Sequence, residues 1–214
     1  MEITWYGRAC FRLRGRDATV ICDPCPPSTG FVAGKHDVDL LTISHPHPDH
    51  CYTRSITAGL TLRRPGEYEH RGVLVTAVRT FHDGERGAAR GENIVFAAEL
   101  DGVHVCHLGD LGHLLTDEQL LELGPIDVLL VPAGGHTTIS PAEAAEVVSQ
   151  VGPRIVIPMH FAVDGGSADL GDPGTFLHEM GVGDAVRQPK AVITPSNLPE
   201  EAQVILLDPR GRTA

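Results

Sequence analysis

The length, composition and charge of this chain exclude several classes of protein. It has 214 residues, of which 42% are hydrophobic and 21% are charged, so it can bury a sizeable core and is not disordered, collagen-like or a coiled coil. With 17 Lys and Arg against 28 Asp and Glu, its net charge is −11, which argues against binding long nucleic acids.

The length favours a single domain over residues 1–214. No run of 18 apolar residues occurs, so we expect no transmembrane helix and no membrane partner. The N-terminus lacks the basic and then apolar pattern of a signal peptide, and five scattered cysteines fit a reducing compartment. We therefore expect a cytoplasmic protein. A sheet edge could pair with a second copy to form a homo-oligomer, but nothing in the sequence requires it.

Strand signals recur along the chain. Short apolar or β-branched runs between turn residues predict strands, and Asp101-Gly102 is typical of a two-residue hairpin turn. In chain order, the predicted strands are Glu2–Tyr6, Cys10–Arg14, Thr19–Cys22, Leu40–Ser44, Val73–Phe81, Asn93–Leu100, Val103–His107, Val128–Val131, Arg154–Ile157 and Gln203–Leu207.

Helix signals lie between the later strands. Two capping boxes, in which Ser or Thr is followed three residues later by Glu or Gln, each mark a helix start, and Gly marks the helix ends. The predicted helices run from Thr116 to Gly124, from Ser140 to about Val151 and from Asp172 to Gly181. Antiparallel hairpins mixed with helix-flanked strands predict a layered α/β (α+β) domain with a mixed sheet.

The most specific motif is the H-x-H-x-D-H string at residues 45–50, directly after a predicted strand. Its two prolines favour extended backbone, in which residues two apart point the same way. His45 and His47 can therefore bind one ion, while Asp49 and His50 turn toward a second position. Imidazole and carboxylate suit Zn²⁺, and also Mn²⁺ or Fe²⁺. The alternative is a solvated polar loop.

Three further candidate ligands each follow a predicted strand: His82, Asp110 and His160. Each alone is more often a turn residue. A sheet, however, gathers such residues at one edge. Together with the string they supply five histidines and two aspartates, enough for two metals about 3.5–4 Å apart with a bridging water.

These motifs, with others along the chain, resemble the metallo-β-lactamase superfamily. The nearest branch is that of small metal-dependent hydrolases related to L-ascorbate-6-phosphate lactonase. Besides the residues above, the matching segments are Ile3-Thr4-Trp5-Tyr6-Gly7, Asp23-Pro24, His82-Asp83, Arg90-Gly91-Glu92-Asn93, His107 to His113, Val131 to Gly135 and Pro158-Met159-His160.

The resemblance implies a four-layer αβ/βα sandwich with two mixed sheets, helices outside and the metals at one edge. It also implies a ligand set: His45, His47 and His82 for the first metal, Asp49, His50 and His160 for the second, and Asp110 between them. The chain departs from the branch at Arg8, where the first strand is usually followed by Gly-His. It is also shorter than the lactonase, so that substrate is not transferred.

Such a site predicts hydrolysis by a metal-bridging hydroxide that attacks a carbonyl or phosphoryl centre. Asp49 would bind a metal and orient the nucleophile. His113 or His136 could protonate the leaving group or bind an oxyanion, although structural hydrogen bonding is at least as good an explanation of both. Arg86 and Arg90 could anchor an anionic substrate, against the alternative of solvated loop charges.

The leading hypothesis is a dinuclear hydrolase, with Zn²⁺ as the favoured metal, acting on a small anionic ester, lactone or phosphoester. A metal-dependent phosphodiesterase or nuclease is the second, and a non-catalytic metal-binding sensor or iron redox protein the third. The Gly- and Asp-rich segment 162–174, after His160, could cover the site or be mobile.

Overall fold

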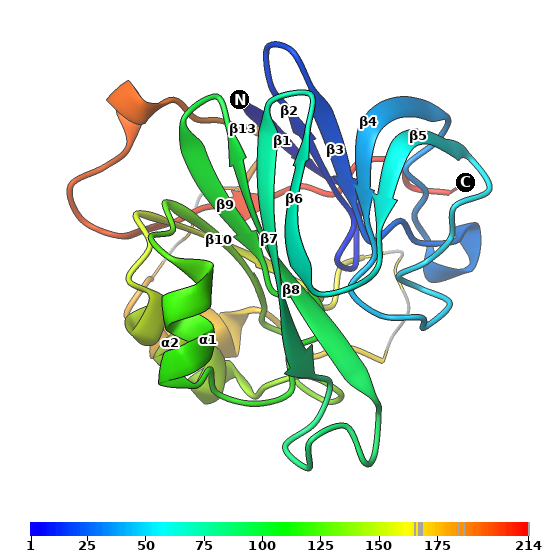
Figure 1. Ribbon diagram of the computed structural model, residues 1–214. Helices are drawn as coiled ribbons and strands as arrows, with labels where there is room; N and C mark the ends of the chain where they lie inside the picture. Colours follow the sequence, from blue (N-terminus) through cyan, green and yellow to red (C-terminus); the bar gives the residue numbers. More distant parts are fainter. Residues whose placement is uncertain (165, 167–168, 184, 186, 214) are drawn as a thin grey trace.

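Two mixed β-sheets pack against each other and form the framework of the molecule (Figure 1). The structure is a computed structural model that describes residues 1–164, 166, 169–183, 185 and 187–213. The six-stranded sheet has the order β13-β1-β2-β3-β4-β5. Its strands are β1 (Glu2–Trp5), β2 (Phe11–Arg14), β3 (Thr19–Cys22), β4 (His36–Thr42), β5 (Ile56–Leu62) and β13 (Ala191–Val192).

The seven-stranded sheet has the order β14-β11-β10-β9-β8-β7-β6. Its strands are β6 (Gly66–His70), β7 (Val73–Phe81), β8 (Glu92–Leu100), β9 (Val103–His107), β10 (Val128–Pro132), β11 (Ile155–Met159) and β14 (Gln203–Val204). The short strands β12 (Arg187–Gln188) and β15 (Leu206–Leu207) pair in parallel as a small third sheet. The two large mixed sheets confirm the predicted fold class.

The helices gather at the seven-stranded sheet, where α1 contacts β7 and α2 contacts β10 (Figure 1). Both predicted capping boxes are present, at Thr116 for α1 and at Ser140 for α2. None of the helices in the described part of the chain is both long and apolar enough to cross a bilayer. The helices are α1 (Asp117–Leu123), α2 (Pro141–Val151) and α3 (Gly174–Glu179), with 3₁₀ turns η1 (Pro27–Thr29) and η2 (Pro195–Asn197).

Alternation along the strands divides the apolar side chains between two faces. Val20 and Leu40 belong to the main core shared by both sheets, whereas their neighbours Ile21 and Leu41 lie in a separate cluster on the opposite face of the six-stranded sheet. Both sets are buried, which explains why these central strands read as continuous apolar runs.

Most predicted strands are confirmed, three of them with identical bounds: Thr19–Cys22, Val73–Phe81 and Val103–His107. The prediction was wrong in three places. It missed β5 and β6, which are edge strands of the two sheets and therefore bury only part of their side chains. It also missed β12 and β13, which have only two residues each. The predicted strand Gln203–Leu207 divides at Ile205 into β14 and β15, because its two halves pair with different strands.

Strand direction brings the predicted ligands to one edge. β9, β10 and β11 run in parallel. β7 and β9 are each antiparallel to β8, so β7 ends at the same edge as β9. At this edge the sheets are joined by backbone hydrogen bonds from Ile94 N to Ser44 O (2.9 Å) and from His160 N to Arg8 O (3.0 Å).

Candidate metal centre

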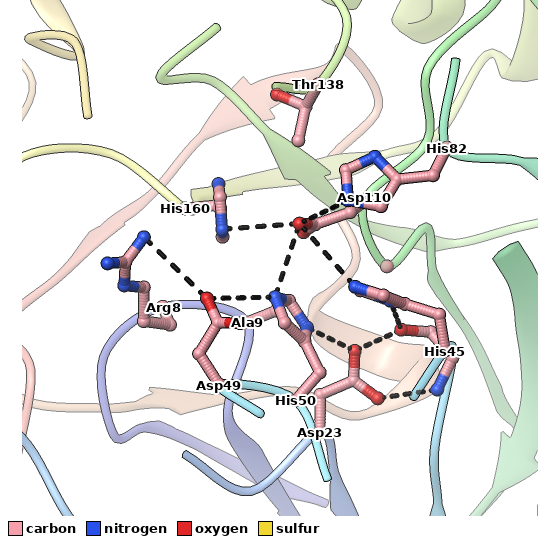
Figure 2. Close-up of polar contacts among 12 residues, drawn as sticks. Arg8, Ala9, Asp23, His45, Asp49, His50, His82, Asp110, Thr138 and His160 are labelled. Carbon is pink, nitrogen blue, oxygen red and sulfur yellow. Dashed lines mark hydrogen bonds and ion pairs between the residues drawn. The ribbon is translucent and has the colours of Figure 1, made fainter. Parts of the chain in front are cut away.

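Five histidines and two aspartates meet where the two sheets join. Figure 2 labels His45, Asp49, His50, His82, Asp110 and His160. The string at 45–50 follows β4, and the other three residues follow β7, β9 and β11. Three groups of side chains each offer ligand atoms that lie within 4.8 Å of one another. Two are the predicted sets, His45, His47 and His82, and Asp49, His50 and His160, and the third combines Asp23 with His45 and His50. The structure thus brings together both ligand sets implied by the sequence.

Asp110 lies between the two groups (Figure 2). Its Oδ2 atom is 3.2 Å from His82 Nε2 and 3.9 Å from His45 Nε2 in the first group. The same oxygen is 3.3 Å from His50 Nε2 and 3.4 Å from His160 Nε2 in the second. One carboxylate can therefore contact ions held by either group.

Several atoms of this cluster are buried without a hydrogen-bond partner among the described residues. They are Nε2 of His45 and His50, Nδ1 of His82, both ring nitrogens of His160 and Oδ1 of Asp110. Leaving a buried polar group unsatisfied costs about 1–3 kcal/mol, so such a concentration in one place calls for a ligand. Imidazole nitrogens and carboxylate oxygens are the donors that divalent zinc, manganese and iron accept. The residues present therefore fit metal ions.

The electrostatics of the cluster favour metal-binding protonation states. Burial and the neighbouring positive charge of His50 lower the pKa of His45 to about 3, so its imidazole is neutral at pH 7. Burial opposes ionisation of Asp110, but the charges of His160 and His50 outweigh it and hold the pKa of Asp110 well below its usual range. His50 differs, because Asp110 and Asp23 raise its pKa despite burial. Binding a metal there would release a proton.

Asp23, to which sequence analysis assigned no role, orients histidines of both groups. It follows β3, is fully buried, and accepts hydrogen bonds from Ser44 N (2.8 Å), Ser44 Oγ and His50 Nδ1 (2.9 Å). Ser44 Oγ lies 2.8 Å from His45 Nδ1, so one carboxylate orients an imidazole in each group. The sequence did offer one indication of this role, because Asp23 directly follows a predicted strand, as the predicted ligands do.

A second buried network positions Asp110. The Asn93 side-chain oxygen accepts a hydrogen bond from Asp110 N (3.1 Å), and its Nδ2 donates to Thr80 Oγ1 (2.8 Å) and Leu108 O (2.9 Å). A side chain at Gly109 would collide with Asn93 and Ser44. Close approach of the β9–α1 loop to both neighbours therefore requires glycine there.

Asp83 organises the loop that follows His82. Its carboxylate accepts four backbone hydrogen bonds of 2.7–3.0 Å, from the N–H groups of Glu85, Gly87, Ala89 and Arg90. Burial works against the charged form, but these donors outweigh it and lower the pKa of Asp83 to about 2. A local charge thus fixes the loop carrying both predicted substrate-binding arginines.

The two arginines of this loop differ in position. Arg90 is exposed and lines the pocket above the cluster, which has a volume of about 280 Å³ and is also lined by His47, Asp49 and Thr137. Arg86 is exposed and is not among the residues that line this pocket. The structure therefore favours Arg90 and not Arg86 as a contact for a bound molecule.

The two predicted proton donors also differ. Phe81 N donates a hydrogen bond to His113 Nε2 (3.1 Å), and His113 Nδ1 lies 2.7 Å from Leu114 O. Both ring nitrogens are thus engaged with backbone, one at the end of β7 and one in the loop of His113 itself, and we do not carry His113 forward as an acid. His136 is exposed next to the pocket residue Thr137, with a left-handed φ of 63°, and its role remains a prediction.

Arg8, the residue at which the sequence departs from the lactonase-related branch, lies at the candidate site. Its side chain is 8% exposed and lines the pocket, and its Nη1 lies 3.8 Å from Asp49 Oδ2 (Figure 2). Nη2 donates hydrogen bonds to Asp169 Oδ1 (2.9 Å) and Oδ2 (3.0 Å). Asp169 comes from the segment 162–174, for which the sequence left open whether it covers the site or is mobile. Residues 165, 167 and 168 of that segment lie outside the described part of the chain.

Comparison with known proteins decides the family. Residues 2–160 match the family model of the beta-lactamase superfamily domain. The chain belongs to the metallo-β-lactamase superfamily. It is 31% identical to a UPF0173 protein of Pyrococcus furiosus over 84% of this chain and 90% of that one. It is 34% identical to a UPF0173 metal-dependent hydrolase of Methanoregula boonei over 75% of this chain and 82% of the other.

A solved structure supports the same assignment. A Thermotoga maritima protein, described as a candidate Zn-dependent hydrolase of the metallo-beta-lactamase superfamily, superposes with a TM-score of 0.80 at 36% identity. The similarity covers 96% of this chain and 97% of that one. The family assigned from the motifs is thus confirmed. The more specific relation to L-ascorbate-6-phosphate lactonase is not supported by these relatives and stays a prediction.

Proposed function

We propose that this metallo-β-lactamase superfamily member is a hydrolase with a two-metal site that acts on a small anionic ester, lactone or phosphoester. The observation that carries the proposal is the position of Asp110 between two histidine groups whose buried atoms have no partner among the described residues. The relatives named as metal-dependent hydrolases support the reaction class. A pocket of about 280 Å³ suits a small molecule.

Each ligand residue has a proposed place. The first ion would be held by His45, His47 and His82, the second by Asp49, His50 and His160, and Asp110 would contact both. When bound, the ions would supply an activated water and stabilise negative charge on the substrate oxygen. We favour zinc because imidazole dominates the donor set and because the T. maritima relative is described as a candidate Zn-dependent hydrolase.

Other side chains at the site would orient the water, hold the histidine ligands and contact the substrate. The side chain of Asp49 is 30% exposed and lines the pocket, where it can orient the attacking water. Asp23 holds the His50 imidazole through Nδ1, leaving Nε2 directed at the cluster. Arg90, at the pocket rim, can contact an anionic group of the substrate. We place this reaction in the cytoplasm, as the composition predicts.

Metal stoichiometry is the first test. We would measure zinc, manganese and iron by elemental analysis of untagged protein, for wild type, Asp110→Ala and His160→Ala. A matched control, His178→Ala, removes an exposed histidine of α3 and leaves the pocket intact. We expect about two equivalents per chain in wild type and control, and clearly less in the other variants.

Turnover is the second test. Metal-loaded protein would be assayed against matched ester, lactone, phosphomonoester and phosphodiester substrates. Hydrolysis that falls at least 100-fold in Asp110→Ala but not in His178→Ala would support the proposal. At most one equivalent of metal after reconstitution would overturn the two-metal site. Two bound metals with no hydrolysis of any substrate would instead favour a metal-binding sensor.

A further inference from the structure

Arg8 is held beside the metal centre in an uncommon conformation. Its φ of 49° lies in the left-handed region, which side chains other than glycine seldom adopt. Its carbonyl accepts hydrogen bonds from Trp5 Nε1 (2.9 Å) and from the backbone N–H of the candidate ligand His160 (3.0 Å). Strain that is stabilised by buried neighbours is a mark of functional positions. The backbone therefore places the guanidinium at a fixed point relative to the metal ligands.

The ion pair between Arg8 and Asp169 is unequal in exposure. The Arg8 side chain is 8% exposed, whereas that of Asp169 is 62% exposed. An exposed carboxylate that leaves the pair regains water at little cost. The buried Arg8 guanidinium, which also lies 3.8 Å from Asp49 Oδ2, would lose its nearer carboxylate, and removing one partner of a buried ion pair is unfavourable. Arg8 thus favours an anion at this position, and the anion can be exchanged.

The geometry of this pair shows which anion fits. Both oxygens of Asp169 accept from Nη2 of Arg8, so the pocket accommodates a carboxylate on the guanidinium. Asp169 itself lines the pocket, together with the candidate ligands. A carboxylate on a small bound molecule could occupy the same position.

The charge of the pocket supports this exchange once metal is bound. Its charged lining residues are two arginines and three aspartates, an excess of one negative charge. Two divalent ions would more than reverse that excess. The loaded site therefore attracts anions, and Arg8 is less screened by water than the exposed Arg90.

We infer that Arg8 is the subsite for a carboxylate of the substrate, and that Asp169 occupies this subsite in the substrate-free protein and leaves it on binding. The inference rests on the proposed function and narrows its substrate class to carboxylate-bearing esters or lactones. Arg8 then determines specificity for substrates that carry a carboxylate, and the Asp169 side chain competes with the substrate for Arg8.

The test compares charged and neutral substrates of equal length. Metal-loaded protein would be assayed with 4-nitrophenyl monoesters of succinate, glutarate and adipate, each beside the neutral alkyl ester of the same length. The variants are Arg8→Met, Arg8→Lys and Asp169→Asn, with Arg16→Met as a matched exposed control outside the pocket. Metal content of every variant would be measured first.

Each variant has a distinct expected result. Arg8→Met lowers kcat/KM for the carboxylate ester by about 10- to 100-fold and changes the neutral ester less than about threefold. Arg8→Lys recovers part of the loss, because a single ammonium lacks the planar fork. Asp169→Asn lowers KM for the carboxylate ester, since its competitor is neutral, and leaves the neutral ester unchanged.

A binding measurement separates this inference from the proposed function. Glutarate binding to metal-loaded protein, followed by calorimetry, should tighten in Asp169→Asn and weaken in Arg8→Met. That result supports the subsite even if no ester is hydrolysed. Equal losses for both ester classes in Arg8→Met, or weaker glutarate binding in Asp169→Asn, would overturn the subsite. Hydrolysis of neutral esters without Arg8-dependent glutarate binding would overturn the subsite while leaving the proposed metal-dependent hydrolytic activity intact.

Discussion

A single carboxylate can orient histidines in both groups of candidate metal ligands. Asp23 is fully buried and bonds Ser44 N at 2.8 Å and His50 Nδ1 at 2.9 Å. Because Ser44 in turn contacts His45, Asp23 fixes ring orientation in both histidine groups. Partners of this kind typically contribute 10- to 100-fold to metal affinity.

We therefore expect Asp23→Asn to weaken zinc binding about 10- to 100-fold, measured by competition with a chromophoric chelator. The amide nitrogen cannot accept the hydrogen bonds that the lost oxygen accepted. Asp127→Asn is the matched control, since it alters another Asp–His contact, with His104 at 3.3 Å, outside the metal centre. Equal affinities in wild type and Asp23→Asn would show that the imidazoles are oriented by packing alone.

At the scale of elements, loops are held by local charge and helices by their caps. Four N–H donors bind Asp83 and shape the loop 83–91. α2 begins with Ser140, whose Oγ accepts from Glu143 N (3.3 Å) while the Glu143 carboxylate accepts from Ser140 N (2.7 Å). The Asp83 hydrogen bonds and the helix cap both join residues within eight positions of each other, so they do not depend on contacts with distant parts of the chain.

The Asp83 loop predicts a pH effect with a definite sign. The folded pKa of Asp83, about 2, lies below the ordinary value of 3.8, so its ionised form stabilises the folded state. This stabilisation is complete above about pH 4 and is lost as the pH falls toward 2. Urea unfolding of metal-free protein should show Asp83→Asn less stable than wild type at pH 6, with the difference shrinking below pH 4. A difference independent of pH would contradict this account.

The cap of α2 predicts a stability change that leaves the metal centre unaffected. Ser140→Ala should lower the free energy of unfolding by about 1 kcal/mol, seen as a lower urea midpoint with unchanged metal content. Ser149→Ala, on the exposed surface near the end of the same helix, should change it by less than about 0.5 kcal/mol. Loss of metal in Ser140→Ala would mean that α2 and the site are coupled.

At the scale of the molecule, the candidate ligands come from both sheets. His45 to His50 follow β4 of the six-stranded sheet, and His82, Asp110 and His160 follow strands of the seven-stranded sheet. Bound ions would therefore cross-link the two sheets at the edge where Arg8 and Ser44 already join them by backbone bonds. One core shared by both sheets also favours the expectation of a single domain.

Metal removal should consequently destabilise the whole molecule. Free zinc at 100 times its dissociation constant would stabilise the folded state by about 2.7 kcal/mol per site, or about 5–10 °C in Tm for a chain of this size. Calorimetry with and without a chelator would measure the shift, which should persist in His178→Ala and largely disappear in Asp110→Ala. An identical Tm in all conditions would show that these ligands bind no metal.

The sequence predicted the central strands better than the edge strands. β7 and β9 were located to the residue because buried β-branched runs are specific to strands. β5 and β6 were missed because edge strands bury only part of their side chains, which leaves a weak pattern. The same difference explains why the late strand at 203–207 was not seen to divide between two partners.

The sequence by itself determined what depends on near neighbours. The H-x-H-x-D-H string, the capping boxes and the hairpin turn at Asp101-Gly102 could be recognised because their geometry is set within a few residues of backbone. His82, Asp110 and His160 were found because strand ends are marked in the sequence.

Tertiary structure decided the contacts between residues far apart along the chain. Arg8 meets Asp169 across 161 positions, and His50 meets Asp23 across 27. Packing likewise engaged His113 with backbone at Phe81 and left Arg90, but not Arg86, at the pocket. Such pairs leave no periodic signal, because a side chain's partner is set by how the two sheets pack, and that packing depends on the whole core at once.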